Sequence, residues 1–104
     1  MAKSLYDNAT GTTGTITLSE SAANFSFLDI YALDANGAVI SVKVISPNGK
    51  KAILSSALHT DTGYYSATLL NISGTSITQS YNKQWYSNTS VANKVKVIRV
   101  DGYK

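Results

Sequence analysis

FSFLDIYALDANGAVISVKVIS, residues 25–46, is the stretch that decides the fold. Two runs rich in apolar side chains flank an Asp-Ala-Asn-Gly turn at 34–37, a pattern typical of a β-hairpin. In the second run three aliphatic side chains alternate with Ser41 and Lys43, which is the two-residue period of a half-buried strand. The stretch therefore predicts a hairpin whose apolar face needs a second layer to cover it.

The first run of the hairpin differs, because its apolar side chains fall on both sides of the predicted strand. Leu28, Ile30 and Ala32 share one side. The other side holds four large apolar residues, Phe25, Phe27, Tyr31 and Leu33. A strand with two apolar faces is either central in a sandwich or lies against another subunit. We therefore predict that this second group forms an interface between copies of the chain.

The rest of the chain repeats the pattern of short strands and turns. No segment of about 11 residues or more shows a helical apolar period, whereas about seven β-prone runs recur with turn signals between them. Outside the hairpin, strands are predicted at residues 14–18, 51–54, 64–72, 76–80 and 94–103, and one helical turn within 19–24. We predict a single domain, 1–104, that is an all-β, jelly-roll-like antiparallel sandwich of about seven to eight short strands.

Composition and charge narrow the class of protein. The 104 residues are 43% hydrophobic and 14% charged with a net charge of +3, which suits one packed core. The nine basic residues are spread over several segments and only Arg99 is an arginine, so we expect no nucleic-acid binding. No apolar run of about 18 residues and no signal peptide occur, so no membrane association is expected and synthesis is expected in a cytoplasm.

Residues for catalysis or metal binding are few. The chain has no cysteine, and His59, with Asp61 nearby, is its one imidazole and lies in no nucleophile motif. Asp29 is the one carboxyl that no turn explains, and a bulge or a pairing with Arg99 or a lysine would account for it. We expect no catalytic residue, no metal site and no cofactor.

The best candidate for ligand binding is the aromatic cluster of residues 81–86. Tyr81, Trp85 and Tyr86 can cover the apolar faces of sugar rings, while Asn82 and Gln84 can hydrogen-bond to hydroxyls. The alternative is core packing, which is the commoner role of a lone tryptophan in a small sandwich.

Two stretches resemble a family of viral proteins. LYDNATGTTGTITLSESAANFSFLDIYALDANG at 5–37 and NKVKVIRVDGYK at 93–104 are similar to the C-terminal domains of bacteriophage and prophage structural proteins, chiefly tail-fibre, baseplate or head-fibre proteins. Domains of that family finish in a strand with the motif Lys-Val/Ile-x-Gly-Tyr-Lys, and in this chain Asp101 stands before Gly102 and Tyr103. The resemblance implies a trimeric tip that contacts the host surface or holds virion parts together, and it carries no catalytic residue.

Three functions follow in order of preference. The first is a non-enzymatic phage virion structural domain, a homo-oligomer with the trimer favoured, whose partners are other virion proteins and a host cell-surface glycan. Its location would be the virion, after synthesis in the bacterial host cytoplasm. The alternative is a monomeric carbohydrate-binding module that uses the aromatic cluster. An enzyme that degrades cell-wall or capsular glycan is the least favoured, because the residues for it are so few.

Overall fold

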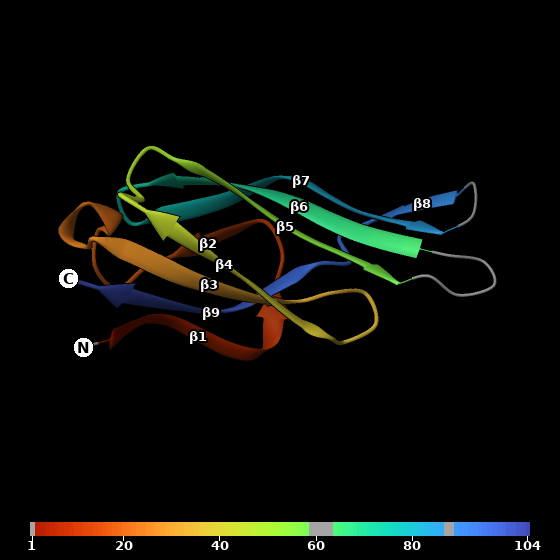
Figure 1. Ribbon diagram of the computed structural model, residues 1–104, viewed down its shortest axis with the longest axis horizontal. Coiled ribbons are helices and arrows are strands. Elements are labelled where there is room, and N and C mark those ends of the chain that lie inside the picture. Colours follow the sequence, from red (N-terminus) through yellow and green to blue (C-terminus); the bar gives the residue numbers. More distant parts are fainter. Residues whose placement is uncertain (1, 59–63, 87–88) are drawn as a thin grey trace.

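A computed structural model describes residues 2–58, 64–86 and 89–104. Within them the chain forms nine strands in two antiparallel sheets that face each other (Figure 1), which confirms the predicted β-sandwich with more strands than expected. The strands are β1 Ala2–Thr12, β2 Thr15–Thr17, β3 Phe27–Leu33, β4 Val39–Ile45, β5 Lys51–Leu58, β6 Tyr64–Ser73, β7 Ser76–Tyr86, β8 Thr89–Ala92 and β9 Lys96–Tyr103.

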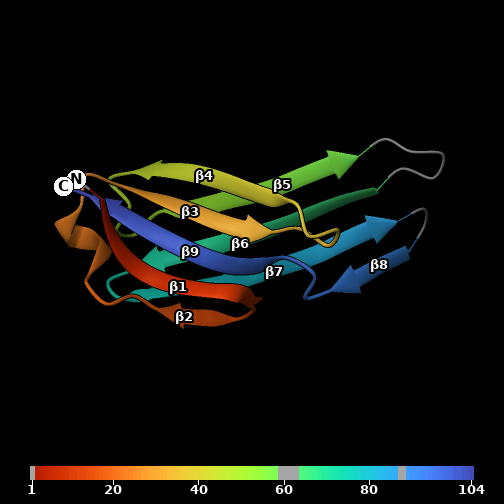
Figure 2. The ribbon, with the colours of Figure 1, turned by 90° about the horizontal axis from the view of Figure 1, so that it is seen from below.

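The two sheets are connected at both sides of the sandwich. Sheet A has the order β1-β9-β3-β4, and sheet B has the order β2-β7-β6-β5 with β8 paired to β7. The chain crosses between the sheets four times, from β1 to β2, from β2 to β3, from β4 to β5 and from β8 to β9. The C-terminal strand β9 lies between β1 and β3, so both chain ends come together at one end of the molecule (Figure 2).

The hairpin of β3 and β4 forms as predicted, and Asp34 closes it. The carboxylate oxygen Oδ1 of Asp34 accepts hydrogen bonds of 2.9 Å from the backbone N–H groups of Asn36 and Ala38. Gly37 adopts a φ of 83°, which glycine tolerates without strain. The second oxygen of Asp34 accepts from the Ser56 hydroxyl at 2.9 Å, which ties the hairpin turn to sheet B.

The core lies between the sheets and takes its largest side chains from both. On β3 the inner face is the one with Leu28, Ile30 and Ala32, each fully buried. Sheet B covers them with aliphatic side chains of β5, β6 and β7, and β9 adds two valines, giving a list of Leu54, Leu70, Ile72, Ile77, Val97 and Val100. The partly buried Ile40 and Val42 of β4 pack against this core, as their alternation predicted.

Phe25 corrects the predicted interface. Its side chain is buried in the core rather than aligned with Phe27, because the single-turn 3-10 helix η1 (Ala22–Asn24) delays the start of β3 to Phe27. The ring of Phe25 covers Gly102, where an added Cβ would lie only 2.6 Å from it. Phe27, Tyr31 and Leu33 do share one face, the outer face of sheet A, where each is partly exposed.

Other differences from the sequence prediction concern strand length. No strand was predicted before residue 14, yet β1 pairs with β9 through two register shifts. β7 continues to Tyr86 instead of ending near residue 80, and β8 forms where no strand was predicted. Among the residues that the structure describes, no helix is long and apolar enough to cross a membrane.

Candidate functional site

An ordered array of side chains covers the outer face of sheet B. The pairing of β5, β6 and β7 places these residues in three cross-strand rows. We call the nine residues the sheet B face: Ile53, Leu69 and Tyr81 in the first row, Ser55, Ala67 and Lys83 in the second, and Ala57, Tyr65 and Trp85 in the third. Large side chains thus flank a middle row in which Ser55 and Ala67 are small.

The aromatic rings of this face are held in fixed positions. Tyr65 and Trp85 are cross-strand partners whose ring centroids lie 6.3 Å apart with an interplanar angle of 25°. The indole Nε1–H of Trp85 donates a hydrogen bond of 3.2 Å to the hydroxyl of Tyr81. Since Tyr81 and Trp85 are four residues apart on one strand, their side chains must lean toward each other across Lys83. The three rings are therefore connected, and we call them the aromatic row, which runs from the third cross-strand row to the first.

The sheet B face is open to solvent. Ile53 is 65% exposed, Tyr65 50% and Tyr81 41%. Contiguous apolar side chains of this size on a surface mark an interaction site more often than single exposed residues do. The face therefore offers ring faces for stacking, with the tyrosine hydroxyls at their edges as hydrogen-bonding groups.

The structure places only part of the predicted cluster on the outer surface of sheet B. Tyr81 and Trp85 lie on the sheet B face, so the core alternative does not hold for Trp85. Asn82 points to the inner side, where its amide donates to the Val95 carbonyl at 2.7 Å and accepts from the Val95 N–H at 2.9 Å. Gln84 is opposite the buried Ser66 and is also on the inner side. The predicted hydroxyl-binding role of both amides was wrong, because alternation along β7 turns them away from the rings.

Tyr86 was predicted for the site, whereas Tyr65 was not and yet lies in it. The side chain of Tyr86 lies outside the described residues, and only its backbone pairing with Tyr64 and Thr89 is known. Tyr65 was not predicted as part of the site. The alternation of residues 64–72 places it on the same side as Ala67 and Leu69, but its partnership with Trp85 depends on a register that the sequence does not state.

The outer face of sheet A is built differently. We call its outward residues the sheet A face: Phe27, Asp29, Tyr31, Leu33, Val39, Lys43, Ile45, Arg99, Asp101 and Tyr103. Phe27 and Tyr103 stack with centroids 4.5 Å apart and an angle of 10°, and the Lys43 ammonium lies 4.4 Å from the Phe27 centroid. The Nε–H of Arg99 donates to both carboxylate oxygens of Asp101, at 2.9 and 3.0 Å.

The charges of the sheet A face act on one another. The hydrogen bond and the charge of Asp101 raise the pKa of Arg99. Partial burial, followed by the nearby charge of Asp29, raises the pKa of Tyr31. Asp29 faces outward by ordinary strand alternation between Lys43 and Asp101, so the bulge predicted for it is not needed. This face therefore pairs its arginine with a carboxylate of its own strand.

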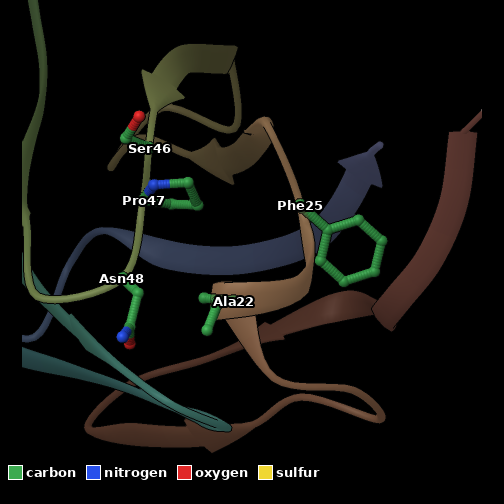
Figure 3. A pocket seen from close by; sticks show the side chains of 6 residues that line it. Ala22, Phe25, Ser46, Pro47 and Asn48 are labelled. Atoms are coloured by element: carbon green, nitrogen blue, oxygen red, sulfur yellow. The ribbon is translucent and has the colours of Figure 1, made fainter.

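A shallow pocket lies at the end of the sandwich where the chain crosses between the sheets. Figure 3 shows Ala22 and Phe25 on one side of it and Ser46, Pro47 and Asn48 on the other. Its volume is about 310 Å³. The Oδ1 atom of Asn48 is already engaged, since it accepts from the backbone N–H of Gly74 at 2.8 Å. The lining residues include no charged group, so the pocket offers little chemistry.

The described residues contain no group of three or more His, Cys, Asp or Glu side chains that could hold a metal ion. His59 and Asp61, the pair considered for catalysis, lie outside the described residues. The sheet B face is therefore the best-supported candidate site.

A scan against protein-family models and a search of curated proteins each gave no match for this chain.

Proposed function

We propose that this chain is a non-enzymatic binding domain that holds carbohydrate against the sheet B face. In the setting that its sequence resemblance implies, it would be part of a phage virion and would contact glycan on the host cell surface. The observation that carries the proposal is the exposed row of Tyr65, Trp85 and Tyr81, which one ring stack and one hydrogen bond hold in place.

The arrangement suits sugars for a physical reason. One face of a pyranose ring presents C–H groups that pack on flat aromatic rings, while its hydroxyls need donors and acceptors at the ring edges. The Trp85–Tyr81 hydrogen bond and the Tyr65–Trp85 stack hold the rings within the chain itself, so binding would cost little ordering of side chains. A rigid aromatic surface of this kind needs no deep cavity.

Titration calorimetry with a panel of bacterial surface polysaccharides tests the proposal. We expect Trp85→Ala to lower the affinity for a bound polysaccharide about 10- to 100-fold, as for a central aromatic residue of an interface. The matched control is Tyr31→Ala, which removes an aromatic ring from the sheet A face and should leave the affinity unchanged. Equal affinities of wild type and Trp85→Ala would refute the site.

Self-assembly is a separate proposal, and it concerns the sheet A face. Val39 and Ile45 are 63% and 71% exposed at the two ends of the edge strand β4, and they extend the apolar part of the face beside Phe27, Tyr31 and Leu33. A trimer that buries these residues would fit a fibre component. Sedimentation velocity at micromolar concentration should show a trimer that Leu33→Arg dissociates, and a wild-type monomer would count against assembly.

A further inference from the structure

We infer that the carbohydrate bound by the sheet B face is acidic, a polymer whose sugar rings carry a carboxylate or a phosphate that pairs with Lys83. This inference rests on the proposed function and adds the chemical class of its ligand.

The distribution of acidic residues is the first observation. The structure describes five of them, and none lies on a strand of sheet B. They lie on sheet A strands or in the connections, and they are Asp7, Glu20, Asp29, Asp34 and Asp101. Lys51 and Lys83 are the charged residues of the described part of sheet B. Among the described residues of sheet B, a negatively charged ligand would therefore meet two cations and no like charge.

The position of Lys83 is the second observation. It occupies the middle row, two residues from Tyr81 and two from Trp85, and same-face neighbours on a strand are about 7 Å apart. A sugar ring stacked on either aromatic residue would bring a charged substituent within reach of the ammonium. Lys83 lies 5.8 Å from the centroid of the Tyr81 ring, which keeps its ammonium beside the aromatic row.

The ion pairs among the described residues are the third observation, and they involve three of the nine cations. Lys3 and Lys104 both contact Glu20, and Arg99 contacts Asp101. Among the described residues, Lys83 has no carboxylate within salt-bridge distance. An ammonium among aromatic rings without a counter-charge is available for an anion that arrives with the ligand.

Single-stranded nucleic acid is also anionic and also stacks on aromatic rings, but it fits less well. Such sites follow the backbone with a series of basic residues. Here only Lys83 lies among the rings, and the arginine of the chain is bound to Asp101 on the opposite sheet.

The test uses the fluorescence of Trp85, the only tryptophan of the chain, as a reporter inside the site. The wild type is titrated with polygalacturonate, with its fully methyl-esterified form, with a phosphomannan and with a dT20 oligonucleotide. The ester keeps the same sugar backbone and carries a neutral methyl ester in place of each carboxylate. We expect an acidic polymer to bind at least tenfold more tightly than the ester, and the better of the two acidic polymers identifies the anionic group.

Two lysine variants complete the test. Lys83→Gln should weaken binding of the acidic polymer about fivefold and leave ester binding unchanged, because a partly exposed ion pair contributes up to about 1 kcal/mol. Lys43→Gln is the matched control, since Lys43 also lies over an aromatic ring but on the sheet A face. It should leave all affinities unchanged.

The outcomes separate the two claims. Equal affinity for the acidic and esterified polymers, or no effect of Lys83→Gln, overturns the acidic ligand but leaves carbohydrate binding intact. Tighter binding of dT20 than of any polysaccharide overturns it as well. No binding of any polysaccharide in the wild type refutes the proposed function itself.

Discussion

Both outer faces of the sandwich carry a stacked aromatic pair and a lysine near a ring, but among the described residues only the sheet A face also carries carboxylates. On the sheet A face, Arg99 is held by Asp101, and Lys43 lies close above Phe27. On the sheet B face, Lys83 has no such partner among the described residues and the rings of Tyr65 and Tyr81 are half exposed. Aromatic content alone therefore does not identify a binding surface. What distinguishes the sheet B face is that one stack and one hydrogen bond fix its rings in place, while Lys83 has no carboxylate partner among the described residues.

The largest expected effect comes from Phe25, which the sequence placed with Phe27. Phe25→Ala should lower the free energy of unfolding by about 3–5 kcal/mol, because it empties a core position over Gly102. Phe27→Ala should cost only about 1 kcal/mol, the value of an exposed aromatic stack. Urea denaturation measures both. Similar losses for the two variants would contradict the separation of core and outer face.

The next prediction compares one cation from each face. Arg99→Ala should lower the free energy of unfolding by about 1–2 kcal/mol, because it leaves the nearly buried carboxylate of Asp101 without its hydrogen-bond donor. Lys83→Ala should change it by less than about 0.5 kcal/mol, as for an ordinary surface position. Thermal or urea unfolding provides the comparison. A stability loss for Lys83→Ala as large as for Arg99→Ala would mean that Lys83, like Arg99, makes a stabilising contact within the chain.

A smaller effect is expected from Tyr65, the ring that the sequence did not predict for the site. Tyr65→Ala removes the stack on Trp85, so polysaccharide affinity should fall about three- to tenfold, equivalent to about 0.5–1.5 kcal/mol. Tyr31→Ala is again the matched control on the sheet A face. If calorimetry gave unchanged affinity for Tyr65→Ala, the site would be confined to β7.

The smallest effect is a pH dependence at the end where the chain termini meet. Hydrogen bonds from Lys3 and Asn24 lower the pKa of Glu20 from 4.5 to about 2. A lowered carboxyl pKa stabilises the fold above pH 4.5, and this contribution disappears as the pH falls from 4.5 through about 2. The difference in unfolding free energy between wild type and Glu20→Gln should therefore close over that range. A difference that stays constant down to pH 2 would contradict the lowered pKa.

The sequence predicted those features that depend on local pattern. The alternation in residues 39–45 and the Asp34 turn gave the hairpin, and the absence of a helical period gave the fold class. Phe25 could not be placed, because η1 shifts the start of β3 and so breaks the alternation that joined it to Phe27. Register was equally hidden, since a shift between Leu69 and Leu70 in the β6–β7 ladder determines which residue faces Trp85.

Only part of the candidate site was predicted, because the site also depends on a strand and a register that the sequence pattern did not show. Aromatic spacing identified Tyr81 and Trp85, but residues 81–86 were not predicted as a strand. Once β7 is known to run to Tyr86, alternation alone places Asn82 and Gln84 on the inner side. The contribution of Tyr65 and Ile53 is non-local, because neighbouring strands bring them to the rings.

The central claim is that the sheet B face, and not the sheet A face, binds carbohydrate. Backbone amide NMR of the isotope-labelled protein, titrated with a bound polysaccharide, tests it most directly. If the sheet B face binds the polysaccharide, we expect shift changes concentrated at residues 53–57, 65–69 and 81–85, with Phe27, Tyr31 and Tyr103 unaffected. Shift changes centred on those sheet A residues, with none at Tyr65 and Trp85, would contradict it.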